Sequence, residues 1–125
     1  MAEKMNLVNW FEIPVKNLSK AKAFYEYVLG VELKLEEMGP MKMAWFPATQ
    51  GAPGTTGSLV LSDGYEPSHK GSVVYFTVPD IEKALARIKE KGGKGLMPKM
   101  SIGEWGFIAQ FEDCEGNRVA LHSPK

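Results

Sequence analysis

Residues 7–30 read LVNWFEIPVKNLSKAKAFYEYVLG and combine two hydrophobic periods in one short stretch. The first part alternates between two faces, as a strand does, and Leu7, Phe11, Ile13 and Val15 fall on one of them. Trp10 and Glu12 fall on the other face. The second part has helical spacing, with Asn17 or Ser19 as a cap and Gly30 as a stop. The stretch predicts a strand followed by a helix over about residues 19–29.

The same order of elements recurs in residues 73–93, VVYFTVPDIEKALARIKEKGG. Phe76 corresponds to Phe11, 65 residues earlier, and Ile81 corresponds to Leu18, 63 residues earlier. Asp80 can cap a second amphipathic helix that runs to about Lys91 and ends at a Gly-Gly pair. Two strand-helix units at this spacing indicate an internal repeat.

Each helix is followed by three further stretches with strand character and turn residues between them. They lie near residues 31–37, 41–46, 58–61, 94–98, 106–112 and 117–122, and SDGYEPSHKG links the two halves. We therefore predict an α+β fold with two tandem β-α-β-β-β modules. The modules span about residues 5–63 and 71–123 of a single domain over 1–125.

The composition makes several classes of partner unlikely. The 125 residues suit one domain, and 15 Lys and Arg balance 15 Asp and Glu. A neutral chain attracts neither nucleic acid nor an anionic membrane, so we expect neither as a partner. No apolar run reaches the length of a signal peptide or a membrane span, and one cysteine, Cys114, suits a reducing compartment. We expect a cytoplasmic protein whose lone thiol is a turn residue rather than a nucleophile.

Two motifs link this repeat to a known superfamily. They are FYEYVLG at residues 24–30 and EDCEGN at residues 112–117. With the duplicated module, they make the chain resemble the glyoxalase, bleomycin-resistance and extradiol-dioxygenase superfamily, also called vicinal oxygen chelate proteins. The resemblance implies a cupped, barrel-like sheet with helices on its convex face. It also implies a small-molecule cleft inside the cup, often completed by a homodimer.

The resemblance also locates the metal ligands of the metal-using members. In those members, His, Glu or Gln side chains on the first and last strands of each module hold one divalent metal. Three of the matching positions here are Trp10, Val73 and Ala120, and the fourth lies near residues 58–61, which contain no His, Glu, Asp or Gln. Because these side chains cannot coordinate a metal, we predict neither a metal site nor another cofactor.

Residues two positions from the expected ligands face the same cup, because strand side chains alternate. They are Glu12, Tyr75 and His122, which we predict to bind the ligand and which are the candidates for catalysis. Two other interpretations stay open. In one, Glu12 and His122 hydrogen-bond each other or a backbone group and hold two strands together. In the other, they belong to a shifted metal site, for which two ligands are too few.

Three tryptophans complete the predicted ligand-binding set. Trp10 either fills the cavity or stacks on a planar ligand, and filling is the commoner outcome. Trp45 and Trp105 are expected at the rim of the cup, with methionines nearby in sequence. Such residues form an adaptable pocket, a core or a dimer seam equally well.

The sequence thus favours a protein that binds a small organic molecule without the usual metal, in the manner of bleomycin-resistance proteins. Whether it is also an enzyme stays open. One alternative is a metal-dependent lyase or isomerase related to lactoylglutathione lyase. The other is a non-enzymatic interaction module whose cleft is filled by its own side chains. The sequence names no substrate.

Overall fold

The computed structural model of the protein describes residues 6–125 and confirms the two β-α-β-β-β modules. The first module consists of β1 (Trp10–Pro14), α1 (Leu18–Leu29), β2 (Lys34–Met38), β3 (Met41–Trp45) and β4 (Thr56–Leu61). The second consists of β5 (Tyr75–Thr77), α2 (Ile81–Glu90), β6 (Lys94–Ser101), β7 (Phe107–Glu112) and β8 (Arg118–Ser123). A one-turn 3-10 helix, η1 (Gly103–Trp105), connects β6 to β7 and was not predicted.

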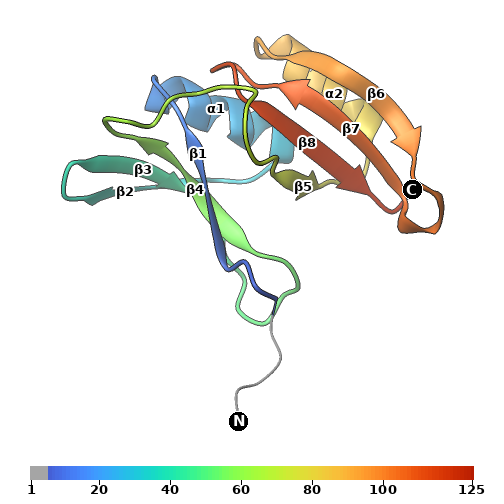
Figure 1. Cartoon of the computed structure of the whole chain (residues 1–125), viewed down its shortest axis with the longest axis horizontal. Helices are drawn as coiled ribbons and strands as arrows, with labels where there is room; N and C mark the ends of the chain where they lie inside the picture. Colours follow the sequence, from blue (N-terminus) through green and yellow to red (C-terminus); the bar gives the residue numbers. More distant parts are fainter. Residues whose placement is uncertain (1–5) are drawn as a thin grey trace.

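Each module forms its own four-stranded mixed sheet (Figure 1). The strand orders are β1-β4-β3-β2 and β5-β8-β7-β6, and the first pair of each sheet is parallel. No strand pairing joins the two sheets over the described residues, so the expected barrel-like sheet is not closed. The two edge strands that would have to pair, β1 and β5, lie instead on either side of a cleft.

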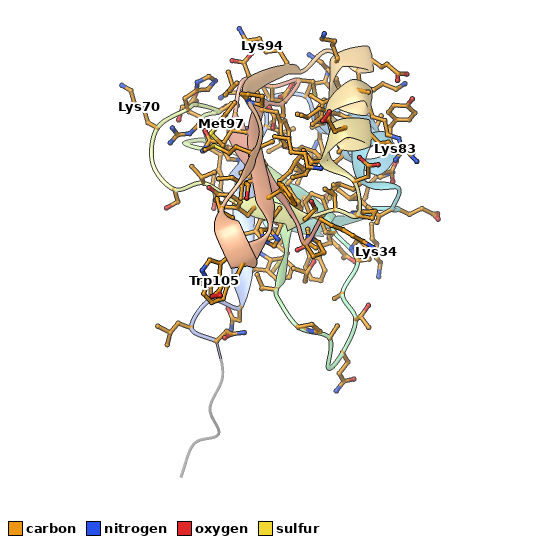
Figure 2. All side chains as sticks on the ribbon, turned by 90° about the vertical axis from the view of Figure 1, so that its right-hand side faces the viewer. Lys34, Lys70, Lys83, Lys94, Met97 and Trp105 are labelled. Carbon is orange, nitrogen blue, oxygen red and sulfur yellow. The ribbon has the colours of Figure 1, made fainter. Side chains whose placement is uncertain are left out.

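The two helices pack on the same side of the sheets. Helix α1 contacts β3 and β4, helix α2 contacts β6, β7 and β8, and the helices touch each other. Figure 2 shows the loop that carries Lys70 on the opposite side from both helices. Within residues 6–125, no helix is long and apolar enough to cross a membrane.

The predicted helix signals are confirmed. The Asn17 side chain accepts a hydrogen bond from the Lys20 N–H at 3.0 Å, and Asp80 caps α2 in the same way. Gly30 ends α1 with a left-handed φ of 69°, a conformation that favours glycine. The expectation for Leu7 was wrong: it is fully exposed, because pairing of β1 with β4 begins only at Trp10.

One hydrophobic core joins the modules. Phe46 and Phe76, from different modules, have ring centroids 5.2 Å apart, and both pack against Phe11 and Tyr25. Gly57 allows Phe11 to lie against β4, since a Cβ there would meet the Phe11 carbonyl oxygen at 2.2 Å. The apolar faces predicted from alternation are therefore the buried ones.

A buried polar cluster also connects the modules, and it unites the two motifs of the resemblance. Asp113, which is 1% exposed, accepts a hydrogen bond from the Tyr25 hydroxyl at 2.6 Å. It also accepts bonds from the Glu115 N–H, the Asn117 N–H and the Asn117 side-chain amide. That amide also donates to the Pro14 carbonyl at 2.8 Å. We call this set of residues, Tyr25, Asp113 and Asn117, the clamp.

The turn at residues 113–117 also docks on the start of α1. The Glu115 carboxylate accepts hydrogen bonds from the backbone N–H groups of Lys16 and Asn17. A carboxylate is favourable there, because the first N–H groups of a helix lack partners and carry a partial positive charge. The EDCEGN motif is therefore explained by packing between modules rather than by chemistry.

Candidate functional site

The site begins with the face of the first sheet that points away from α1. Ser58 lies on β4, the strand between β1 and β3. It is paired with Glu12 on β1 and with Trp45 on β3. Because side chains alternate along a strand, Trp10 shares this face with all three. The next residues along, including Ile13 and Leu59, face α1 and are buried.

A cleft of about 830 Å³ lies between β1 and β5. Trp10 and Glu12 line it from β1, and Tyr75 and Thr77 line it from β5. The loop that ends at Thr56 and the end of α1 complete its walls. The structure thus brings together three of the residues predicted to bind ligand: Trp10, Glu12 and Tyr75.

Glu12 is exposed in this cleft and already has a partner. Its carboxylate accepts a hydrogen bond from the Tyr65 hydroxyl at 2.9 Å. That bond raises the pKa of Tyr65 above its ordinary value, because ionisation of the phenol would break it beside a negative charge. The structure therefore differs from both readings that joined Glu12 to His122. Tyr65 was missed because its segment reads only as a turn-rich linker.

The two tryptophans of the first sheet touch. Trp10 and Trp45 pack edge to face, with ring centroids 5.2 Å apart and planes at 73°. Their strands flank β4, so the rings meet across β4 and above Ser58, which is 0% exposed. This pair fills part of the predicted cup, as the filled-cleft alternative expects, and the cleft between β1 and β5 remains open beside it.

Two buried polar atoms, one in this ring pair and one on β4, have no partner among the described residues. They are Nε1 of Trp45 and Oγ of Ser58, and both are buried. Buried polar groups in proteins are nearly always hydrogen-bonded, so these two atoms require partners that the described residues do not supply. Sequence reasoning overlooked Ser58, because residues 58–61 were considered only as a possible source of metal ligands.

His122 and Trp105 lie elsewhere. His122 Nε2 donates to the Trp105 carbonyl oxygen at 2.6 Å, which ties β8 to η1. Neither residue lines the cleft between β1 and β5. Trp105 is 72% exposed and projects from the β6–β7 connection, at the end of β6 opposite Lys94 (Figure 2).

The residues at the superfamily's metal positions do not fit a metal. Trp10 and Val73 line the cleft with an indole ring and an aliphatic side chain, neither of which is a metal ligand. Ala120 is fully buried. Within residues 6–125, no three His, Cys, Asp or Glu side chains are grouped so that they could hold an ion. The His122 Nε2 atom carries the proton that it donates to Trp105, so that atom is not a free ligand.

The two remaining reactive side chains, Cys114 and His69, do not line the cleft between β1 and β5. Burial raises the pKa of the Cys114 thiol to about 11, with Asp113 and Glu115 adding to the shift. A thiol with that pKa is protonated at neutral pH and is a poor nucleophile. His69, in the linker between the modules, is exposed and pairs with Glu112 at 2.8 Å.

Comparisons with known proteins agree with this architecture. A solved structure of TnmS3, an antibiotic binding protein from Streptomyces sp. CB03234, is 27% identical, covers 99% of this chain and 100% of its own, and gives a TM-score of 0.67. A glyoxylase/bleomycin resistance protein/dioxygenase domain from Frankia sp. EAN1pec is 15% identical, with coverage of 98% and 100% and a TM-score of 0.72. No curated protein sequence matches the chain.

A larger enzyme shares the same fold. A mutant of glyoxalase I from Zea mays is 22% identical over 93% of this chain, with a TM-score of 0.67. This chain covers 45% of the length of that enzyme. The family model for the Glyoxalase/Bleomycin resistance protein/Dioxygenase superfamily matches residues 7–121, nearly the whole chain. The protein therefore belongs to the Glyoxalase/Bleomycin resistance protein/Dioxygenase superfamily.

Proposed function

We propose that the protein binds a small organic molecule in the cleft between β1 and β5, without the metal of the superfamily's metal-using members. The observation that carries this proposal is the lining of the cleft: Trp10 and Glu12 on one strand face Tyr75 and Thr77 on another. A volume of about 830 Å³ lies within the range of roughly 300–1,000 Å³ that is typical of ligand pockets. TnmS3, a structure of equal length, is an antibiotic binding protein, which supports the same class of function.

The residues of the cleft divide the binding task between them. Trp10 and Tyr75 offer aromatic surface for an apolar or planar body. The Glu12 carboxylate, held by Tyr65, offers a hydrogen-bond acceptor to a ligand N–H or O–H group. If the protein also catalyses a reaction, Glu12 and Tyr75 are the candidates placed to move a proton, and a lyase or isomerase step is the reaction class that we expect.

A thermal-shift screen tests the proposal, because a ligand that binds only the folded state raises the melting temperature. The screen uses a metabolite panel and, separately, Ni²⁺, Zn²⁺, Mn²⁺ and Fe²⁺. We expect organic compounds to raise the melting temperature and Glu12→Gln or Trp10→Leu to reduce that rise. Glu37→Gln, an exposed carboxylate on β2, is the matched control.

The metal arm can overturn the proposal. Stoichiometric metal in protein purified without chelators, lost in Glu12→Ala or His122→Ala, would establish a shifted metal centre instead. If no compound raises the melting temperature of the wild type or of Trp10→Ala, the ligand-binding proposal is wrong and a non-enzymatic interaction module is favoured instead.

We propose in addition that two copies of the chain associate. Apolar side chains are exposed on the second module, notably Tyr75 at 47%, Met100 at 46% and Trp105 at 72%. A second copy would remove this surface from water, and the site would then gain walls from the partner. Light scattering after size exclusion checks this: we expect a dimer, and a monomer at every concentration contradicts it.

A further inference from the structure

The Trp45–Ser58 pair carries the inference. The indole N–H of Trp45 can only donate a hydrogen bond, and the Ser58 hydroxyl can donate as well as accept. The two residues are paired across β3 and β4 with their side chains on one face, and both polar atoms are buried without a partner among the described residues. An acceptor atom within reach of both would satisfy two buried donors at once.

This donor pair is next to the cleft, and Trp10 lies between the donor pair and the cleft. Trp10 lines the cleft, and its ring lies against Trp45 above Ser58. A ligand held in the cleft therefore reaches the donors when the Trp10 ring turns aside from its edge contact. Among the described residues the Trp10 ring is held by its contact with Trp45 and not by a side-chain hydrogen bond, so a ligand that supplies both a flat body and a polar atom can replace it.

The charge of Glu12 decides which polar atom suits the donors. Glu12 is paired with Ser58 on the same face, so its negative charge is close to the donors and disfavours a carboxylate or phosphate there. Resting on the proposed function, we propose that Trp45 Nε1 and Ser58 Oγ bind the carbonyl oxygen of an uncharged ligand with a flat apolar body. Aromatic ketones, amides and esters are the classes that meet these conditions.

Three probes that share one body test this inference. They are 2-acetylnaphthalene, 2-isopropenylnaphthalene, which replaces the carbonyl oxygen with a methylene group of similar shape, and the anion 2-naphthoate. We expect 2-acetylnaphthalene to bind at least about tenfold more tightly than the other two in calorimetric titration, since the hydrogen bonds are lost or opposed in those. Ser58→Ala and Trp45→Phe are each expected to weaken its binding by about tenfold.

A second serine gives a matched control. Ser123 is also 0% exposed, and its hydroxyl donates to the Lys125 carbonyl at 2.7 Å. Ser123→Ala is expected to lower the melting temperature of the free protein and to leave probe binding unchanged. Ser58→Ala is expected to raise the melting temperature by roughly 1–4 °C, because it removes a buried hydroxyl without a partner.

Several results would overturn the inference. If 2-acetylnaphthalene does not bind, or binds no better than its isopropenyl analogue, the donor pair does not bind a carbonyl oxygen. A lower melting temperature for Ser58→Ala, with unchanged probe binding, would identify a buried water as the partner instead. If the metabolite panel stabilises the protein while the carbonyl preference is absent, the proposed function stands and this inference alone fails.

Discussion

The clamp and the Trp45–Ser58 pair are both buried polar sites, and they differ in how fully they are satisfied. In the clamp, Asp113 accepts four hydrogen bonds from three residues. In the pair, two buried polar atoms have no partner in the described chain. A satisfied network fixes the arrangement of the modules, whereas unsatisfied donors are kept at a cost in stability, which is expected of a binding site.

Removal of the clamp carboxylate should have the largest effect. We expect Asp113→Ala to lower the free energy of unfolding by about 3–5 kcal/mol, since the Tyr25 hydroxyl and the Asn117 groups would lose a buried partner together. Urea denaturation followed by circular dichroism measures the change. A loss below about 1 kcal/mol would mean that water replaces the carboxylate and that the clamp does not hold the modules.

A pair of tyrosines on α1 tests burial directly. Tyr25→Phe removes one clamp bond in the core and should lower the free energy of unfolding by about 1–2 kcal/mol. Tyr27 donates a similar bond to Glu90 at 2.7 Å on the surface, and Tyr27→Phe should leave stability nearly unchanged. Equal losses in the two variants, by the same urea measurement, would contradict a special role for the clamp.

Alkaline pH should lower the free energy of unfolding through Cys114. The unfolded thiol ionises near 9.0, whereas the folded thiol has a pKa of about 11. Its contribution to stability is complete below pH 9 and is lost as pH rises through about 11, because only the unfolded chain releases the proton in between. Urea midpoints at pH 8, 9, 10 and 11 should fall less steeply in Cys114→Ser than in the wild type. Parallel slopes would show that the thiol is solvated.

The smallest expected change concerns the exposed pair in the cleft. Glu12→Gln should lower the pKa of Tyr65 back toward 10.0, because the negative acceptor that holds the phenol proton is gone. Absorbance of the phenolate during alkaline titration measures it, with Tyr65→Phe identifying the signal. An unchanged titration curve would show that Glu12 and Tyr65 do not pair in solution.

Much of the fold was predictable from local pattern. The alternation in β1, the caps at Asn17 and Asp80, and the repeat of strand and helix all depend on residues close together in the chain. The β6–β7 connection was less predictable, because η1 has no periodic pattern and its contact with His122 joins residues far apart in sequence. For the same reason Tyr65 was not foreseen as the partner of Glu12, whereas the contact of His122 with the Trp105 carbonyl agrees with the interpretation that gave it a backbone partner.

The site was predicted in part. Trp10, Glu12 and Tyr75 were found because alternation assigns each residue of a strand to a face, and the structure gathers them around one cleft. Ser58 was missed because residues 58–61 were considered only as a source of metal ligands, and Tyr65 because its segment reads only as a turn-rich linker. Their importance comes from burial and from a contact over 53 residues of sequence.

By itself, the sequence determined the modules and the faces of their strands, because these properties follow from residue type and short-range periodicity. The resemblance to the superfamily added that Trp10, Val73 and Ala120 occupy its metal positions. Only the tertiary structure decided that the two motifs meet in a clamp, that the sheets stay separate and that Trp10 covers two buried polar atoms. Those features depend on which distant segments pack together, and packing is set by the shape and burial of the whole core rather than by any local pattern.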